Sequence, residues 1–515
     1  MPHVIFLRSR ADSYSTNTRE AGKGEAMLMS ALRRGVALSS SRFCASLLRH
    51  GYRVLAFGQG NSGALGLGDL LDSHDPALVA DLPDDVVSIA CGHFHSVAVT
   101  GEGEVFTWGR NNEGQLGHGG QSDFNPNVCD LPRRASEGEM AGARVREASA
   151  SGVCTFAVAE DGRAFSWGSS KRGQLGLGAG VFSSAEPAQI ACRLPLRTIS
   201  AGWGHAVAIA DTELGELVSW GYPVHGRLGY GHSEIGQQSQ QEAPQGAANA
   251  PGMSAEEGEM AAACVWQPRE VGRLSGIKIV GAACGADHTI VVTEWGAVFA
   301  FGDNSMFQLG SDLLEGSGAM QDLLQGEPSL SAEMSMGGGG GLHRTDSLGS
   351  GASEVIQSVL FPIPVRVGQV ATGYAHTLCL ASRADPSDPS FGEVGCLLSW
   401  GWDTASQLGH DGAAFDGLLG VRPAFVQGFE GVGAVMADPV KVAAGRVHSA
   451  ALTRGGDLYT WGSSKNGRLG FDCLSSSETV GATAVPQKVE LPEELGVRRI
   501  VDVACGYDHT LLLVE

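Results

Sequence analysis

A ten-residue phrase recurs seven times along this chain, and this repeat constrains the fold more than any other feature. Each copy begins with an aromatic residue and Gly, and each ends with Leu-Gly at a fixed offset. The copies begin at Phe57, Trp108, Trp167, Trp220, Phe301, Trp400 and Trp461. Repeat units of roughly 50 residues cannot bury their apolar faces alone, so each must pack against its neighbours. The sequence therefore predicts one repeat architecture, with the recurring aromatic residues packed in the core or between units.

A second phrase, Gly-x-x-His, lies between successive copies of the first. It ends at His95, His205, His288, His376, His448 and His509. In a seventh copy, SGVCTFAVA, we align Gly152 with the glycine and Thr155 with the histidine. The segment that follows, such as HSVAVTGEGEVFTWG at 95–109, alternates apolar residues on both sides of a glycine turn. This pattern predicts a tight β-hairpin.

Seven hairpin-based units predict an all-β fold, a seven-bladed β-propeller. The last unit stops at Glu515, before an aromatic-Gly strand, whereas the first unit begins with such a strand alone, RVLAFG at 53–58. We therefore expect the N- and C-terminal strands to close the ring within one blade, which removes an open sheet edge.

Two segments interrupt the repeats, and their composition is of low complexity. Residues 232–264 are rich in Gln, Ala, Glu and Gly, and residues 311–357 include five consecutive glycines at 337–341. Such compositions are typical of flexible loops. We therefore expect a propeller over 51–515 with two loop insertions, preceded by a separate segment, 1–50.

The N-terminal segment has the composition of a transit peptide. Residues 26–53 contain five arginines and no acidic residue, with Ser and Ala interleaved among apolar residues. This composition is typical of organelle targeting, most simply to mitochondria. A disordered basic tail without a targeting role is the alternative, and the cytosol or nucleus is then the location.

The formal net charge of −21 bears on the choice of partner. An acidic body repels phosphate groups, so extensive direct nucleic-acid binding is not expected and a basic protein surface is the favoured partner. No apolar run approaches the length of a membrane-spanning helix. Eleven cysteines without a CxxC pair indicate reduced thiols inside a cell.

We find no catalytic or metal-binding motif that gives a candidate site. The repeated histidines could ring the centre of the propeller, but equivalent positions in seven blades cannot converge to about 2 Å from one ion. A hydrogen-bonded structural role is favoured for them. GQGNSG at 58–63 matches G-x-G-x-x-G but does not lie in a βαβ unit. The sequence therefore predicts a non-enzyme with no catalytic residue, no metal and no cofactor.

The two residues inside the Gly-x-x-His turn vary from copy to copy. Exposed Trp, Tyr, Phe and Arg side chains are typical anchors of protein interfaces. We therefore expect this turn to display a partner-binding surface, although simple tolerance of the turn to substitution is the alternative. The candidate partner-binding residues are His93, Phe94, Trp203, Asp287, Tyr374, Arg446, Tyr507 and Asp508.

Over residues 51–515 the phrases resemble the repeats of the regulator of chromosome condensation family. The copies WGRNNEGQLG, WGSSKRGQLG and WGSSKNGRLG, with the Gly-x-x-His strands, carry the resemblance. It implies a seven-bladed propeller that binds proteins. A light-sensing member of the family carries tryptophans at this turn in successive blades, whereas only Trp203 matches here, so light sensing is not implied.

The resemblance implies two functions. Organelle-type members are associated with organelle RNA processing and ribosome assembly, which favours a non-catalytic scaffold in mitochondria. The founding member binds a small GTPase on one face and uses an inserted hairpin to exchange its nucleotide. Neither 232–264 nor 311–357 alternates as a hairpin does, so guanine-nucleotide exchange is the alternative function.

Overall fold

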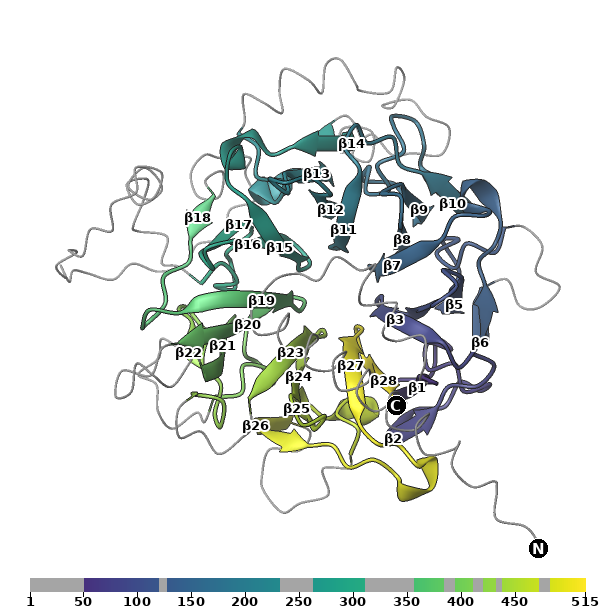
Figure 1. Ribbon diagram of the computed structural model, residues 1–515, viewed down its shortest axis with the longest axis vertical. Helices are drawn as coiled ribbons and strands as arrows, with labels where there is room; N and C mark the ends of the chain where they lie inside the picture. The colour runs from purple at the N-terminus through teal and green to yellow at the C-terminus, as the bar shows by residue number, and fades with distance from the viewer. Residues whose placement is uncertain are drawn as a thin grey trace, which may run out of the picture.

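The computed structural model describes residues 51–119, 127–231, 263–310, 356–383, 394–410, 420–431, 438–471 and 482–515. Segment 1–50 and nearly all of both expected insertions lie outside these residues. The described residues form seven four-stranded antiparallel sheets that stand around a central axis (Figure 1). The predicted all-β seven-bladed propeller is therefore confirmed.

Each sheet is one blade, numbered here by chain order, with its strands given from the axis outward. Blade 1 is β3 (Val86–Cys91), β4 (His95–Thr100), β5 (Val105–Arg110) and β6 (Val128–Arg134). Blade 2 is β7 (Val145–Ala150), β8 (Cys154–Ala159), β9 (Ala164–Ser169) and β10 (Ser183–Gln189). Blade 3 is β11 (Leu196–Ala201), β12 (His205–Ala210), β13 (Leu217–Gly221) and β14 (Val265–Glu270). Blade 4 is β15 (Ile279–Cys284), β16 (His288–Thr293), β17 (Val298–Gly302) and β18 (Gln357–Ser358).

The remaining blades follow the same order. Blade 5 is β19 (Arg366–Thr372), β20 (His376–Arg383), β21 (Val394–Gly401) and β22 (Ala424–Phe425). Blade 6 is β23 (Pro439–Ala444), β24 (His448–Thr453), β25 (Leu458–Ser463) and β26 (Ala482–Lys488). Blade 7 is β27 (Ile500–Cys505), β28 (His509–Val514), β1 (Arg53–Gly58) and β2 (Ser73–Leu78). Short 3-10 turns lie at η1 (Gly138–Met140), η2 (Val224–Gly226), η4 (Gly272–Leu274), η5 (Lys465–Gly467) and η6 (Glu493–Leu495).

The ring closes in blade 7, where strands from both ends of the chain share one sheet. β1 pairs with β28 in an antiparallel register that runs from Arg53 opposite Val514 to Gly58 opposite His509. Figure 1 shows the purple strands β1 and β2 beside the yellow strands β27 and β28. The predicted closure by N- and C-terminal strands is therefore confirmed.

The recurring aromatic residues pack between blades, as the sequence indicates. All seven are buried. Each lies against the Leu-Gly glycine of the preceding blade: a Cβ on Gly117, for example, would lie 2.7 Å from Trp167 Nε1. In four blades the indole Nε1 also donates to a carbonyl of the preceding blade: Trp108 to Ala64, Trp220 to Gln174, Trp400 to Gln308 and Trp461 to Gln407. Through these contacts the repeated phrase joins each blade to the next.

Substituting Gly117 by Ala is expected to destabilise the propeller by about 3 kcal/mol. Gly117 has a φ of +72°, which costs an L-residue about 1–2 kcal/mol, and the new methyl group would collide with Trp167. Gly142→Ala is the matched control, because Gly142 has a φ of +77° and no atom within 4 Å of the added Cβ. Urea unfolding of both variants separates the cost of the collision with Trp167 from the cost of the positive φ. Equal decreases in the free energy of unfolding would show that the aromatic contact is unimportant.

The repeated histidines join neighbouring blades. Each imidazole Nε2 lies 2.8–3.3 Å from a Ser or Thr hydroxyl of the next blade. The pairs are His95–Thr155, His205–Thr289, His288–Thr377, His376–Ser449, His448–Thr510 and His509–Ser96. The hydroxyls donate their own proton to a backbone carbonyl, as Thr155 does to Gln115 at 2.7 Å. The imidazole Nε2–H must therefore be the donor in the histidine bond.

These bonds give the histidines the structural role that the sequence favours. The six side chains are buried in separate blades, each with its own hydroxyl partner. In the described part of the chain, no group of three or more His, Cys, Asp and Glu side chains is placed to hold a metal ion.

The seventh copy of the turn corrects the sequence alignment by one residue. Cys154 pairs with Gly168 as His95 pairs with Gly109, so Cys154, and not Thr155, stands at the histidine position. Thr155 is the hydroxyl that His95 contacts, and Gly152 takes the place of His93. The residue at the hydroxyl position of blade 3 is Ala206, so the seam between blades 2 and 3 lacks both partners of the bond. Cys154 and Ala206 are buried in one apolar cluster instead.

The nine cysteines of the described ranges are all free thiols. Within those same ranges, no helix has the length and apolar character needed to cross a membrane.

Candidate protein-binding site

The Gly-x-x-His turns of six blades and the equivalent turn of blade 2, which begins at Ser151, meet around the axis at one face of the propeller, called here the turn face. They line a cavity of about 90 Å³. Backbone hydrogen bonds join neighbouring turns around it: the N–H of Tyr507 donates to Gly92 at 3.3 Å, and that of Arg446 donates to Tyr507 at 3.2 Å. The variable turn residues are thus held side by side on a rigid ring.

Four of these turn residues form a closed cycle of aromatic contacts, called here the aromatic quartet. Its members are His93, Trp203, Tyr374 and Tyr507. Ring centroids are 6.1 Å apart for His93–Trp203 and for Trp203–Tyr374, 6.3 Å for Tyr374–Tyr507 and 4.6 Å for Tyr507–His93. The quartet comes from blades 1, 3, 5 and 7, so side chains from across the ring meet over the axis.

Small residues in two of the three intervening blades make room for the quartet. Blades 2 and 4 place Gly152 and Ala286 at the same turn position. A Cβ on Gly152 would lie 3.1 Å from His93 and 3.4 Å from Trp203, so the glycine allows these two rings to approach each other. Trp203 is 40 % exposed, whereas the other three members are half-buried. Burial and the nearby Arg446 lower the pKa of His93 to about 4, so its ring is neutral at neutral pH.

Four arginines stack on aromatic rings at this face. The guanidinium carbon lies 5.5 Å from the ring of Phe94 for Arg110, 4.5 Å from Tyr507 for Arg446, and 5.5 Å from Tyr222 for Arg227. Arg172 lies 5.8 Å from Trp203 and 5.5 Å from Tyr222. Aromatic and guanidinium groups together are the side chains most enriched at binding hot spots.

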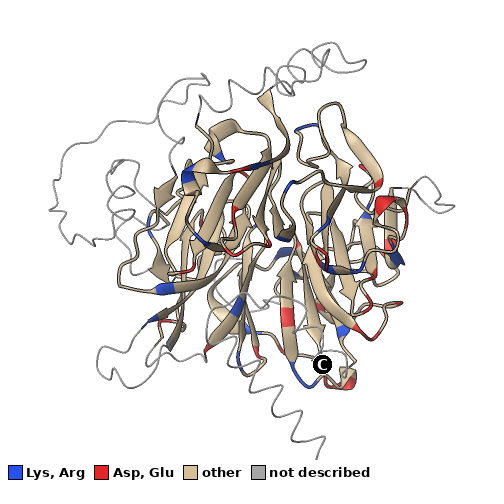
Figure 2. Ribbon diagram, turned by 45° about the horizontal axis from the view of Figure 1, so that its top comes forward, with Lys and Arg blue, Asp and Glu red and all other residues tan. Residues whose placement is uncertain are grey.

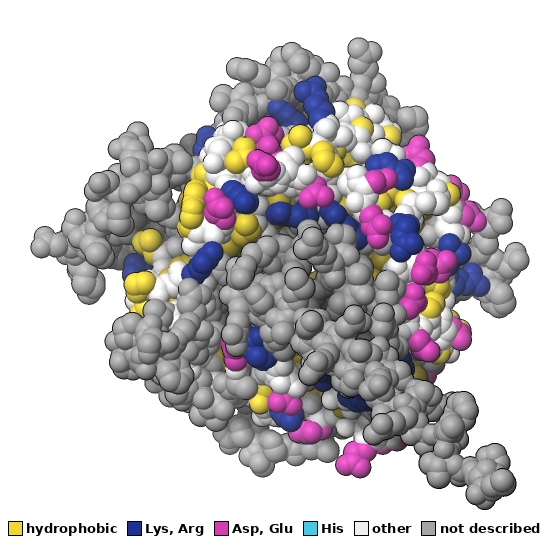
Figure 3. Space-filling model, in the orientation of Figure 1, with side chains coloured by type: hydrophobic (Ala, Val, Ile, Leu, Met, Phe, Trp, Pro, Cys, Tyr) yellow, Lys and Arg dark blue, Asp and Glu magenta, His cyan; other side chains and the backbone are white. Residues whose placement is uncertain are grey.

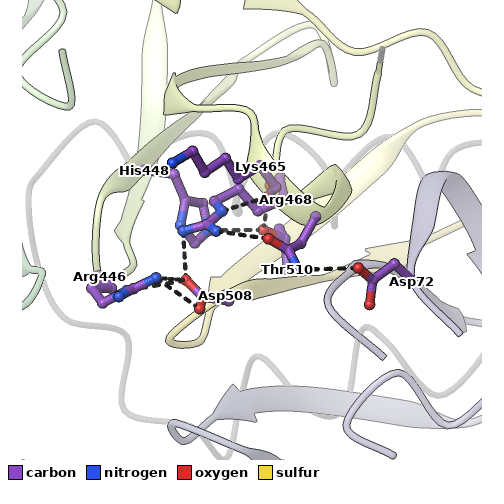
Figure 4. A network of polar contacts seen from close by, with 8 residues as sticks. Asp72, Arg446, His448, Lys465, Arg468, Asp508 and Thr510 are labelled. Atoms are coloured by element: carbon purple, nitrogen blue, oxygen red, sulfur yellow. Dashed lines mark hydrogen bonds and ion pairs between the residues drawn. The ribbon is translucent and has the colours of Figure 1, made fainter. Parts of the chain in front are cut away.

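Asp508 and Asp287 position arginines and are not displayed as free acids. The Asp508 carboxylate is buried and accepts hydrogen bonds from Arg446 and Arg468 of blade 6 (Figure 4). Asn466, from the same loop as Arg468, donates to Asp72 of blade 7 at 3.1 Å. Asp287 is paired in the same way with Arg227 of blade 3. Both pairs therefore lock a loop of one blade to the turn of the next.

Substituting Asp508 by Ala is expected to cost about 3 kcal/mol of stability, because removing one partner leaves the buried Arg468 charge without compensation. Asp457→Ala is the control: its pair with Lys488 is exposed and is expected to change stability by less than about 1 kcal/mol. Chemical denaturation of both variants measures the difference. Similar small losses would mean that Asp508 does not hold the loop.

The structure brings the eight sequence candidates together in two roles. His93, Trp203, Tyr374 and Tyr507 form the quartet, with Phe94 and Arg446 packed against Tyr507. Asp287 and Asp508 anchor arginines from preceding blades.

Sequence reasoning missed Arg172, Tyr222, Arg227 and Arg468. For the last two a signal existed, because each GRLG phrase is followed in the next repeat by Gly-x-Asp-His. Nothing comparable in the repeat pattern pointed to Arg172 or Tyr222, whose contacts are visible only in the structure.

Charges of both signs are interspersed over the described blades. Figure 2 shows Lys and Arg beside Asp and Glu on the ribbon, and Figure 3 shows the same mixture among the coloured side chains of the face that it displays. At the turn face, aromatic rings and guanidinium groups stand around a small cavity. Such an arrangement suits recognition of another molecule by packing and ion pairing.

Comparison with known families gives a match over nearly the whole propeller. Residues 53–512 match the RCC1-like domain.

Three curated relatives cover most of the chain. The chain is 28 % identical to the ultraviolet-B receptor UVR8 of Arabidopsis thaliana, over 81 % of this chain and 74 % of the receptor. It is 30 % identical to the regulator of chromosome condensation of Xenopus laevis, over 70 % of this chain and 81 % of that protein. It is 26 % identical to the mitochondrial RCC1 domain-containing protein RUG3 of Arabidopsis thaliana, over 64 % of this chain and 72 % of RUG3.

Solved structures share the fold. Yeast RCC1 (Prp20), solved bound to Kap60, superposes with a TM-score of 0.65 at 18 % identity, covering 90 % of this chain and 89 % of that one. A second structure, of Prp20p from Saccharomyces cerevisiae, was solved together with a study of its binding to Gsp1p and histones. It gives a TM-score of 0.63 at 18 % identity, covering 90 % of this chain and 92 % of that one.

Proposed function

The chain belongs to the family of RCC1-like domains, and from that premise we propose that it is a non-catalytic scaffold that docks a partner protein on its turn face. The aromatic quartet carries the proposal, because four rings and a stacked Arg446 occupy the position where turn residues differ between blades. Relatives support a protein partner, since yeast RCC1 is solved bound to Kap60. The net charge of −21 favours partners with a basic surface at long range.

We further propose that the scaffold acts in mitochondria and supports organelle RNA processing or ribosome assembly. The acid-free, arginine-containing segment 26–53 supports this location. The relative RUG3, named as mitochondrial, is consistent with it.

Proximity labelling with the full-length chain, tagged at its C-terminus, tests both parts. We expect RNA-processing or ribosome-assembly proteins of the mitochondrial matrix among the labelled proteins. A double substitution, Trp203→Ala with Tyr374→Ala, is expected to remove these partners without changing location. Trp295→Ala is the matched control, because Trp295 is 63 % exposed in the β16–β17 hairpin, away from the turns. Partners that persist in the double variant would contradict docking on the turn face.

Guanine-nucleotide exchange on a small GTPase is the second candidate. The 30 % identity to the regulator of chromosome condensation favours it, and such exchange needs no catalytic side-chain chemistry. The segments that could supply an inserted hairpin, 232–264 and 311–357, lie almost entirely outside the described residues. Two results would favour exchange over the organelle scaffold. One small GTPase of the cytosol or nucleus would be the most strongly labelled protein, and the purified chain would accelerate release of nucleotide from that GTPase.

A further inference from the structure

Arg172 differs from the other arginines that stack on the turn face. Arg110 is ion-paired with Glu113 at 2.8 Å, Arg446 with Asp508 at 2.9 Å, and Arg227 with Asp287. Among the described residues, no carboxylate pairs with Arg172. Within the part of the chain that the structure describes, one guanidinium at this face thus has no anionic partner.

The position of Arg172 is fixed. Its guanidinium reaches from blade 2 across the seam and contacts the rings of both Trp203 and Tyr222 of blade 3. Gly204 makes room for it: a Cβ at this position would lie 2.9 Å from Arg172 Cδ. The other turns carry a side chain at the position of Gly204. The two ring contacts hold the guanidinium in place before any ligand arrives, which lowers the entropy cost of binding.

The unpaired charge coincides with the most exposed ring of the aromatic quartet. Trp203 is 40 % exposed, and its indole packs against the same guanidinium. An exposed indole offers apolar contact area, and the guanidinium offers two parallel N–H donors that match a carboxylate.

Long-range charge does not decide which group binds here. The body of the protein is acidic, but at physiological ionic strength charges are screened beyond about 8 Å. An incoming anion therefore interacts mainly with the guanidinium that it touches. The Asp287 carboxylate of this face already pairs with Arg227.

We propose that Arg172 and Trp203 bind an acidic side chain of a partner protein, with the carboxylate on the guanidinium and an adjacent apolar residue on the indole. This rests on the proposed docking function and names the chemistry of its partner at one point of the turn face. Partner segments with Asp or Glu beside an aromatic or aliphatic residue fit the site. A basic partner surface would then need a local acidic residue at this point.

Selection of peptides tests the proposal. The full-length chain is immobilised through its C-terminus and challenged with a phage library of random heptapeptides. The same selection is run on Arg172→Gln and on Arg163→Gln. Arg163 is the matched control because it stacks on Phe165 at 5.5 Å in the same blade and pairs with Asp161 in the β8–β9 hairpin, away from the turns. Equal thermal midpoints establish that the variants are folded.

The expected result is enrichment of Asp or Glu next to an apolar residue in peptides recovered by the wild-type chain. The enrichment should disappear with Arg172→Gln and persist with Arg163→Gln. In a synthetic peptide from the selection, replacing the acidic residue by its amide should weaken binding about tenfold on the wild type and by less than about twofold on Arg172→Gln.

Three outcomes would overturn the inference. In the first, the selected peptides show no enrichment of Asp or Glu, or they show the same enrichment on Arg172→Gln. Either result would mean that Arg172 does not recognise the partner, although the turn face could still dock one. Tighter binding of a phosphoserine peptide than of its Glu counterpart, by tenfold or more, would assign the site to phosphate. In the third, the double variant Trp203→Ala with Tyr374→Ala recovers as many phage as the wild type, or the wild type recovers no more phage than the bare support. Either result would reject the turn face as a docking surface and with it the proposed function.

Discussion

Lowering the pH from 7 to 5 is expected to unfold the propeller. The six histidines that join the blades are buried and neutral, with Nε2–H donated to a hydroxyl. A second proton would have to reside on Nδ1, and in five of the six this atom has no hydrogen-bond partner within the described residues. Burial accordingly lowers the pKa of His95 and His376 to about 3 and that of His288 and His509 to about 4.

The sign follows from the number of protons bound in each state. An unfolded histidine has a pKa of about 6.5, so below that pH the unfolded chain binds protons that the folded chain excludes, and folding stability falls with pH. Each histidine with a folded pKa near 4 contributes a loss of about 2 kcal/mol between pH 7 and pH 5. Four such groups give roughly 8 kcal/mol, which is comparable to the whole stability of a typical domain. Asp403, whose pKa burial raises to about 6, takes up a proton in the folded state and offsets part of this loss.

Urea unfolding at pH 7.5, 6.5, 6.0 and 5.5 measures this dependence. His95→Gln keeps an N–H donor toward Thr155 but cannot titrate. Below pH 6 the free energy of unfolding of this variant should therefore fall less steeply than that of the wild type, and the two slopes should differ by about 1.4 kcal/mol per pH unit. A wild-type stability that is flat from pH 7.5 to 5.5 would mean that the buried histidines take up protons without opening the seams.

Removal of the closing strand is the second large effect. A chain that begins at residue 60 lacks β1, whose Leu55 and Phe57 are fully buried against blade 6 and β28. It also leaves the edge of β28 unpaired and β2 without a neighbour. Truncation of a single buried aromatic residue costs about 3–5 kcal/mol, so loss of the whole strand exceeds the stability of most domains. We expect no cooperative unfolding transition and a tendency to aggregate through the exposed edge.

Comparison with a chain that begins at residue 51 isolates the effect of the strand. Size-exclusion chromatography and thermal unfolding should find the longer chain monomeric and cooperative and the shorter one neither. A synthetic peptide of residues 51–59 should restore a transition to the shorter chain. A monomeric, cooperatively melting chain from residue 60 would refute the role of β1 as the closing strand.

The sequence predicts the fold well because repetition and closure are local patterns. The aromatic-Gly phrase occurs in every blade and Gly-x-x-His in six of the seven, and RVLAFG supplies the strand that the last unit lacks. The sequence alignment of the turn around Gly152 is one residue out of register, because Gly152 and Thr155 have the same spacing as Gly and His in Gly-x-x-His. Spacing would have corrected it, since Trp108 follows His95 by 13 positions and Trp167 follows Cys154 by 13.

Contacts between blades were harder to predict, because they depend on residues that are distant in sequence. Arg468 and Asp508 are 40 residues apart and meet only when blade 6 packs on blade 7. Arg172 lies in an ordinary copy of the phrase, WGSSKRGQLG, and only the structure places it between Trp203 and Tyr222. The turn residues were identifiable as candidates, whereas their division into displayed and anchoring groups required the packing of neighbouring blades.

The number of blades is odd, and this has a consequence for the aromatic quartet. Aromatic and non-aromatic turn residues can alternate strictly only around a ring with an even number of members. With aromatic residues on blades 1, 3, 5 and 7, two aromatic side chains must become neighbours once, and this happens between blades 7 and 1. His93 and Tyr507 meet there with ring centroids 4.6 Å apart and a tilt of 37°, closer than any other pair of the quartet. The odd number of blades thus places the one pair of adjacent aromatic turn residues beside blade 7, the blade in which the N-terminal strand closes the circle.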